Sequence, residues 1–202
     1  MSDLVLYGSI HSRTFTARWI LEELGVAYRV VDTDIYRGDQ KSPAYLAINP
    51  MGKVPAITDD GVVVTETPAI CLHLADRYGL GTLAPAIDDP RRGPYLRWSV
   101  FATAVLEPAV YLRDKELPSR SVGWGDYDTA LDTLESALTP GPWLLGDMFS
   151  AADVAVGAVL TVAVFNKRVA GRPVLQAYND RLMARPACVR AAEANWPSGG
   201  AS

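Results

Sequence analysis

A proline at the start of a predicted strand is the first residue whose position suggests binding chemistry. Pro55 follows Val54 at the end of a turn in NPMGKVPAI, residues 49–57. If the Val54–Pro55 peptide bond is cis, the chain turns so that the main-chain N–H and C=O of Val54 point outwards. Those two groups can then pair with an extended peptide as another strand would. The alternative is an ordinary proline at the edge of a sheet.

An acid and a hydroxyl open the next helical pattern, ETPAI, residues 66–70. A helix N-terminus offers unpaired N–H groups and partial positive charge, so it favours a carboxylate ligand. The hydroxyl and N–H of Thr67 can hold that carboxylate, while Glu66 can accept from an ammonium group. Together the two residues suit the two ends of an α-amino acid. The alternative is a capped helix beside a solvated glutamate.

The first 80 residues alternate between strand and helix patterns, and these elements must position both segments. Strands are predicted at 4–7, 27–32, 54–58 and 62–64, and helices at 13–24, 42–48 and 67–79. The resulting order, β-α-β-α-β-β-α, predicts one mixed sheet with helices on both faces.

After residue 80 the strand patterns stop and helical patterns take over. We predict an α/β domain over 1–80, a linker over 81–89 and an all-α domain over 90–202. A long helix is expected over 90–112, with a kink at Pro108. Ser150 followed by Asp153 resembles a capping box before the apolar helix AADVAVGAVLTVAVF, residues 151–165.

Composition and charge argue against several classes of function. The net charge is −4 and Lys and Arg form no dense run, so we expect no nucleic-acid partner. No stretch reaches the roughly 18 apolar residues of a membrane span, and the N-terminal residues lack a secretory pattern. Cys71 and Cys188 have no metal-binding spacing. We therefore expect a cytoplasmic protein with no membrane partner and no metal.

A strand-like main-chain slot followed by an amino-acid clamp is what a γ-glutamyl tripeptide would use. With these segments the chain resembles the cytosolic glutathione transferases, over essentially its whole length from LYGS to RPACVRA. The matching stretches are NPMGKVPAI, TETPAICLHLADRYG and FSAADVAVG, and SRTFTARWILEELGVAYRVV is similar to the first helix and second strand of bacterial and fungal members. The resemblance implies a thioredoxin-like N-terminal domain and a helical C-terminal domain.

The resemblance also implies a role for each candidate binding residue. Pro55 would be cis, and Val54 would pair with the cysteinyl unit of glutathione. Glu66 and Thr67 would hold the γ-glutamyl end, with Thr67 standing where many members have serine. Lys53 matches a position that is often polar and could meet the glycyl carboxylate.

The residue that activates the thiol is expected in YGSIHSRT, residues 7–14. A hydroxyl donor and the positive end of a helix would stabilise a thiolate and lower the thiol pKa. Ser12, at the mouth of the first helix, matches the bacterial and fungal relatives, and Tyr7 matches the tyrosine of other classes. Arg13 could add positive charge close by. The structural alternatives are a plain helix cap for Ser12 and a packing residue for Tyr7.

These inferences predict a glutathione S-transferase that ionises the thiol of glutathione and presents it to a small hydrophobic electrophile. Glutathione would be the co-substrate, and no metal or redox cofactor is needed. The resemblance implies a homodimer in which the first domain of one subunit packs against the helical domain of the other. Two alternatives stay open: a non-catalytic binding or assembly module, and a glutathione-dependent isomerase or peroxidase.

Overall fold

The computed structural model describes residues 3–115 and 117–197. Contacts divide the chain into two compact units, Met1–Tyr78 with Pro186–Ser202, and Gly79–Arg185. The last helix therefore groups with the α/β unit, because α9 (Pro186–Asn195) packs along α1 (Thr14–Leu24). The domain limits 1–80, 81–89 and 90–202 stay a prediction.

Four strands of the first unit form one mixed sheet in the order β2-β1-β3-β4. Their bounds are β1 Leu4–Gly8, β2 Arg29–Asp32, β3 Ala56–Asp59 and β4 Val62–Thr65. β1 runs parallel to β2 and antiparallel to β3, and β3 and β4 form an antiparallel hairpin. The sheet and the helices around it confirm the fold class predicted for this unit.

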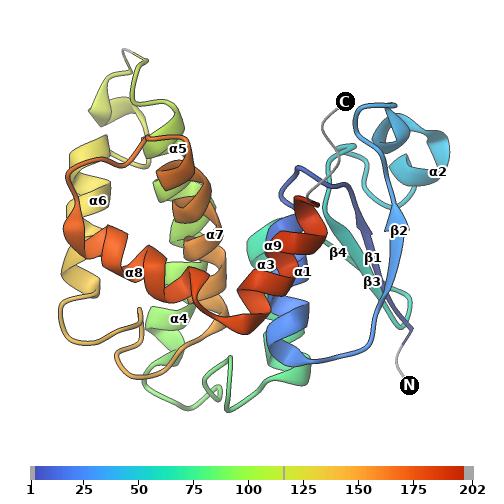
Figure 1. Cartoon of the computed structure of the whole chain (residues 1–202), viewed down its shortest axis with the longest axis horizontal. Coiled ribbons are helices and arrows are strands. Elements are labelled where there is room, and N and C mark those ends of the chain that lie inside the picture. The colour runs from blue at the N-terminus through green and yellow to red at the C-terminus, as the bar shows by residue number, and fades with distance from the viewer. Residues whose placement is uncertain (1–2, 116, 198–202) are drawn as a thin grey trace. The chain divides into compact units, whose positions relative to one another are not determined.

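Helices cover both faces of this sheet (Figure 1). α1, α3 (Thr67–Tyr78) and α9 lie together on one face, and the short α2 (Pro43–Leu46) lies on the other. α1 ends at Gly25, which has the left-handed φ of 63° and donates its N–H to the Leu21 carbonyl. Glycine adopts that conformation without steric cost, so it terminates the helix.

A buried carboxylate joins the end of β3 to α3. The Asp59 side chain is fully buried, and it accepts hydrogen bonds from Tyr78 at 2.6 Å and His73 at 2.8 Å. Arg77 places its guanidinium 3.4 Å from the same carboxylate. Because a buried charge needs such partners, the structure gives His73 a structural contact.

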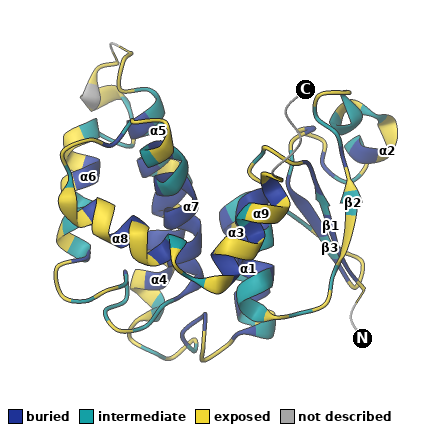
Figure 2. Cartoon of the chain, viewed as in Figure 1, coloured by how far each residue is buried: buried dark blue, intermediate teal, exposed yellow. Residues whose placement is uncertain are grey.

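The helices and strands of the second unit, among its described residues, are all helices. Besides short 3-10 and π-helical turns they are α4 Arg92–Phe101, α5 Glu107–Tyr111, α6 Tyr127–Ala137, α7 Ala151–Phe165 and α8 Pro173–Met183. α7 is apolar around most of its circumference and is the most deeply buried helix of the unit, as Figure 2 shows. A helix that is hydrophobic all round must be surrounded by other elements.

The long helix predicted over 90–112 is interrupted before Pro108, not at it. A π-helical turn, Ala102–Leu106, separates α4 from α5, and Pro108 lies in the first turn of α5. Proline has no N–H to donate, and its ring crowds the carbonyl four residues earlier. The widened turn accommodates both effects, so the irregularity falls one turn earlier than expected.

A capping box begins α7, as predicted from Ser150 and Asp153. One carboxylate oxygen of Asp153 accepts the N–H of Ser150 at 2.9 Å and its hydroxyl at 3.0 Å. The other accepts the N–H of Leu144 and the hydroxyl of Tyr178, both at 2.9 Å. Burial raises the pKa of Asp153 to about 6, because desolvation outweighs these hydrogen bonds, which lower it. Asp153 thus ties a loop, α7 and α8 together.

Candidate functional site

The turn before β3 presents an open main chain. The Val54–Pro55 peptide bond is cis, as expected. Among the residues that the structure describes, no hydrogen bond within the chain engages the N–H or C=O of Val54. Both groups of this half-buried residue are therefore available to an extended partner.

Two side chains of the preceding segment fix this turn. The hydroxyl of Tyr45 donates to the Lys53 carbonyl at 2.5 Å, and the amide of Asn49 donates to the same oxygen at 2.8 Å. Burial raises the pKa of Tyr45 to about 12, so the phenol keeps the proton that it donates. The Lys53 side chain is exposed, with no ion pair to the described residues. The main chain is thus fixed while the ammonium group stays available.

Glu66 immediately precedes α3 in an unusual conformation. The helix begins at Thr67 itself, so Glu66 takes the capping position directly before it. Glu66 has a φ of 68°, and its carbonyl accepts the N–H of Ile70 at 2.9 Å. A left-handed non-glycine residue costs about 1 kcal/mol or more and is often found at functional sites. The Glu66 carboxylate is exposed and has no ion pair among the described residues.

Ser12 lies in the loop between β1 and α1, where its hydroxyl is half-buried. Its Oγ is 2.6 Å from the Ser9 carbonyl and 2.8 Å from the Thr14 Oγ1. It also accepts the N–H of Thr14 at 3.1 Å. A hydroxyl carries a single proton, so both short contacts are satisfied when Thr14 donates to Ser12 and Ser12 donates to Ser9. The Ser12 hydroxyl can therefore redirect its one donated hydrogen bond from the Ser9 carbonyl to a stronger acceptor.

Tyr7, the second candidate hydroxyl, lies near the end of β1. Its half-buried ring makes an edge contact with the ring of Tyr45, with centroids 6.3 Å apart. Its hydroxyl forms no hydrogen bond with the described part of the chain. Arg13 is exposed next to the start of α1 and makes no side-chain capping bond there.

Strand register brings the three predicted segments to one end of the sheet. Tyr7 of β1 pairs with Ala56 of β3, and Ala56 pairs with Thr65 of β4. The loop that holds Ser12 follows Tyr7, the cis-proline turn precedes Ala56, and Glu66 follows Thr65. A main-chain slot, a carboxylate at a helix start and a hydroxyl loop therefore share one edge of the α/β unit.

The hydroxyl loop depends on a close approach at Gly8. A Cβ atom at this position would lie 2.3 Å from Cγ2 and 2.7 Å from Oγ1 of Thr14. We expect Gly8→Ala to push Thr14 away from Ser9 and Ser12, lowering the free energy of unfolding by about 1–3 kcal/mol and reducing activity. Urea denaturation and initial rates measure both effects. Gly93→Ala is the control, because nothing lies within 4 Å of a Cβ there; equal stability of the two variants would contradict the prediction.

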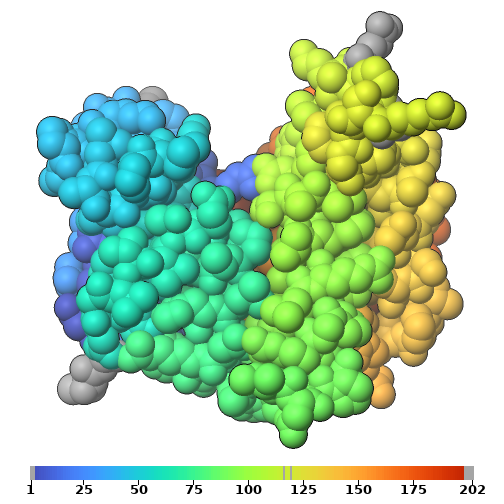
Figure 3. Space-filling model, turned by 180° about the vertical axis from the view of Figure 1, so that it is seen from behind, coloured from blue at the N-terminus to red at the C-terminus, as the bar shows by residue number. Residues whose placement is uncertain are grey.

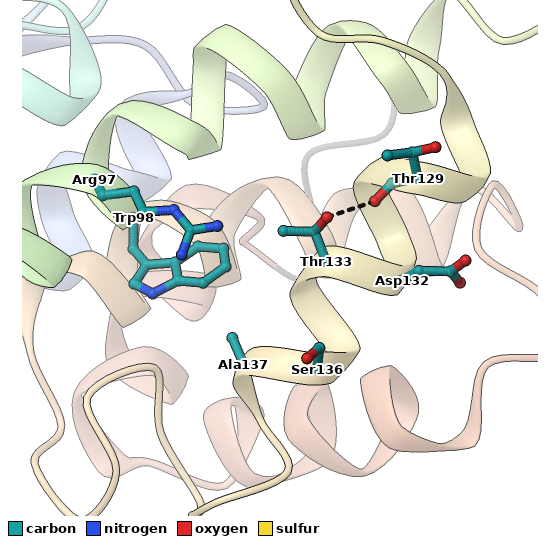
Figure 4. Close-up of a pocket in the computed structure, with 7 residues that line it drawn as sticks. All are labelled: Arg97, Trp98, Thr129, Asp132, Thr133, Ser136 and Ala137. Carbon is teal, nitrogen blue, oxygen red and sulfur yellow. Dashed lines mark hydrogen bonds between the residues drawn. The ribbon is translucent and has the colours of Figure 1, made fainter.

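The helical unit holds a separate cavity of about 460 Å³ between α4 and α6 (Figure 4). Arg97 stacks its guanidinium over the Trp98 ring, 4.2 Å from the centroid. Thr133 donates its hydroxyl to the Thr129 carbonyl at 2.7 Å. None of the predicted catalytic or glutathione-binding residues lines this cavity; its walls are Arg97, Trp98, Thr129, Asp132, Thr133, Ser136 and Ala137.

The described residues offer neither a membrane-spanning helix nor a metal site. No helix within residues 3–115 and 117–197 is long and apolar enough to cross a membrane. The same residues contain no group of three or more His, Cys, Asp or Glu side chains placed to hold a metal ion. Both cysteines are buried, and burial raises the pKa of the Cys71 thiol to about 12. A thiol with so high a pKa is a poor nucleophile.

A thioredoxin-like unit with a cis-proline before its third strand, followed by a helical unit, defines the glutathione transferase architecture. Two family models match in that order: "Glutathione S-transferase, N-terminal domain" over residues 2–76 and "Glutathione S-transferase, C-terminal domain" over residues 118–190. The chain belongs to the glutathione S-transferase family.

Relatives and solved structures agree with this assignment. The chain is 30% identical over 164 residues to glutathione S-transferase hmp2 of Hypomyces subiculosus, covering 74% of this chain and 77% of the relative. A glutathione transferase of Methylococcus capsulatus superposes with a TM-score of 0.80 at 29% identity, covering 95% and 98% of the two chains. One from Burkholderia graminis, solved with two glutathione molecules per subunit, gives 0.79 at 26% identity, covering 97% and 90%.

Proposed function

We propose that this protein is a glutathione S-transferase that binds glutathione at the described sheet edge and activates its thiol for attack on a small hydrophobic electrophile. The observation that carries the proposal is the main chain of Val54 beside the cis bond, unpaired by any described residue, at the same sheet edge as Glu66 and Ser12. Family membership supports glutathione as the co-substrate.

The residues present fit each part of glutathione. The N–H and C=O of Val54 would pair with the cysteinyl unit as an added strand does. Glu66, with no ion pair among the described residues, would accept from the γ-glutamyl ammonium, and Thr67 at the helix start would hold the adjoining carboxylate. Lys53 would neutralise the glycyl carboxylate. Both charged side chains are exposed, so binding would give each a partner at little desolvation cost.

Ser12 would act on the sulfur. Its O–H would keep its proton and redirect its hydrogen bond from the Ser9 carbonyl to the thiolate, a stronger acceptor, and the bond from Thr14 would polarise the donating hydroxyl. The thiol proton would leave to solvent. Sulfur would then form a bond to the electrophilic carbon, and the leaving group would depart with the bonding electron pair. Binding both reactants at one site supplies the proximity that such a reaction needs.

Glutathione affinity tests the binding roles of Glu66 and Lys53. Glu66→Gln and Lys53→Met should each weaken binding about tenfold, the value of one charge-assisted hydrogen bond at an exposed position. Isothermal titration calorimetry measures the change. Glu193→Gln and Lys115→Met are exposed controls that should bind as the native protein does. Native affinity in both site variants would place the ligand elsewhere.

Retention on immobilised glutathione, followed by a panel of electrophiles, hydroperoxides and cis-enols, tests the function itself. We expect retention and conjugation. Retention without turnover of any compound would favour the non-catalytic alternative, and turnover of only hydroperoxides or cis-enols would favour the peroxidase or isomerase. Failure to bind the resin or free glutathione would refute the proposal.

A homodimer stays part of the proposal. The family resemblance is its basis, and apolar side chains exposed on β4 and α4 are candidates for contact with a second subunit. Val62 and Val63 belong to the edge strand β4, and Leu96 and Val100 to α4; all four are at least 40% exposed. Figure 3 shows the surfaces of the units that carry these segments, in teal and green. Light scattering measures the mass in solution. The cytoplasmic location also stays a prediction.

A further inference from the structure

The last residue of α9 reaches back to the loop that holds Ser12. The side-chain amide of Asn195 donates to the Ser12 carbonyl at 3.2 Å. The main-chain carbonyl of Asn195 accepts the N–H of His11 at 2.9 Å. One residue, far away in the sequence, therefore bonds two consecutive residues of the loop that leads into α1.

These bonds act where the loop needs support. His11 has a φ of 53°, a left-handed conformation that costs free energy for a non-glycine residue and persists only when surrounding contacts hold it. His11 directly precedes Ser12, so its backbone angles aim the Ser12 hydroxyl. Asn195 is completely buried, so water does not compete for its bonds.

The packing of α9 holds Asn195 in place. Trp196 lies against Phe15 of α1 with ring centroids 4.9 Å apart. Arg190 forms an ion pair with Glu22 of α1 at 2.7 Å. α9 is thus fixed along α1, and Asn195 stands at its end beside the start of α1. The side-chain oxygen of Asn195 has no hydrogen-bond partner among residues 3–115 and 117–197, which is an unusual cost for a buried amide.

We propose that Asn195 is a positioning residue for the thiol-activating hydroxyl: its two bonds hold His11 and the Ser12 carbonyl, and so direct the Ser12 hydroxyl towards the sulfur. This inference rests on the proposed function. The Asn195 oxygen has no partner among the described residues, so the reason for a buried amide at this position is its N–H group, which bonds the Ser12 carbonyl. Asn195 touches neither substrate, so its substitution should alter thiol activation more than glutathione affinity.

The test uses Asn195→Ala in the full-length protein. We expect glutathione affinity within about threefold of native, kcat about tenfold lower, and a pKa of the bound thiol higher by about 0.5–1. The thiol pKa is read from the ultraviolet absorbance of the bound thiolate as pH rises. Because the thiolate fraction recovers above the new pKa, the loss in kcat should shrink at high pH.

Two controls separate positioning from stability. Trp196→Ala removes the ring contact between Phe15 and the residue directly after α9 but leaves both loop bonds, so it should lower the free energy of unfolding without moving the thiol pKa. Asn195→Asp keeps the size of the side chain but loses the donor, so it should raise the thiol pKa as Asn195→Ala does. A native thiol pKa in both Asn195 variants would overturn the inference.

A double substitution links the effect to Ser12. If Asn195 acts through Ser12, Asn195→Ala should have little effect in a Ser12→Ala background. There it should change kcat by less than about twofold and the thiol pKa by less than about 0.2. Full additivity would overturn the inference. Ser12→Ala alone tests the proposed function, because an unchanged thiol pKa in that variant would mean that Ser12 is not the activator. If the thiol pKa shifts in Ser12→Ala but not in Asn195→Ala, only the role of Asn195 is refuted.

Discussion

Ser12→Ala is expected to lower kcat about 10²- to 10³-fold, the usual loss when one preorganised donor to a developing or stabilised anion is removed. Affinity for glutathione should stay within about threefold, because Val54, Lys53, Glu66 and Thr67 would still hold the peptide. Stopped-flow or steady-state conjugation of an aryl halide measures kcat, and calorimetry measures affinity. A variant with native kcat would show that Ser12 is only a loop residue.

The pH dependence of Ser12→Ala has a definite sign. The Ser12 hydroxyl donates to the anionic form of the thiol, so it lowers the thiol pKa below its ordinary value of about 8.5. Removing the donor raises that pKa. The rate at neutral pH then falls partly because less thiolate is present, and this part should be recovered as pH rises through the new pKa.

Tyr7→Phe is the matched variant for the other hydroxyl of the same region. The phenol forms no hydrogen bond with the described residues, so its removal should leave the fold intact. Its ring contact with Tyr45 does not require the hydroxyl. We expect near-native kcat for Tyr7→Phe if Ser12 activates the thiol. The reverse pattern, loss in Tyr7→Phe and full rate in Ser12→Ala, would transfer the role to Tyr7.

Local patterns were sufficient for the parts of the site that short segments build by themselves. Val54-Pro55 before a β-rich run marked a turn whose cis bond the family resemblance implied, and the acid and hydroxyl before an apolar helical pattern predicted the start of α3. The hairpin between β3 and β4 then sets the register. Because the turn and the helix start depend on residues near one another in the chain, propensity and turn chemistry could predict their positions, while the cis form of the bond came from the resemblance.

Features that depend on distant contacts could not be predicted in this way. Nothing in the pattern of residues 186–195 distinguishes a helix that packs on α1 from one that packs in the helical unit, since both need one apolar face. The bonds of Asn195 to His11 and Ser12 depend on that packing. Tyr45, whose hydroxyl donates to the Lys53 carbonyl, lies in the short helix predicted over 42–48, for which no part in the site was predicted. Tertiary context decided each case.

The largest stability effect is expected from Asp153→Ala, which should lower the free energy of unfolding by about 3–5 kcal/mol. The substitution removes a buried acceptor and leaves four donors without a partner: two N–H groups, the Ser150 hydroxyl and the Tyr178 hydroxyl. Urea denaturation followed by circular dichroism and tryptophan fluorescence measures the change. Asp147→Ala, at an exposed position of the same loop, should change stability by less than about 0.5 kcal/mol.

Asp153→Asn separates the charge of this side chain from its hydrogen bonds. In the native protein burial raises the pKa of Asp153 from its ordinary value of 3.8 to about 6, so the folded state binds the proton more tightly than the unfolded state. The stability that the protonated carboxyl contributes is therefore lost as pH rises from about 4 to about 6. The free energy of unfolding of the native protein should therefore fall, relative to that of Asp153→Asn, by up to about 3 kcal/mol as pH rises over that range. A difference that grows with pH would mean that the four hydrogen bonds outweigh the cost of burying the charge.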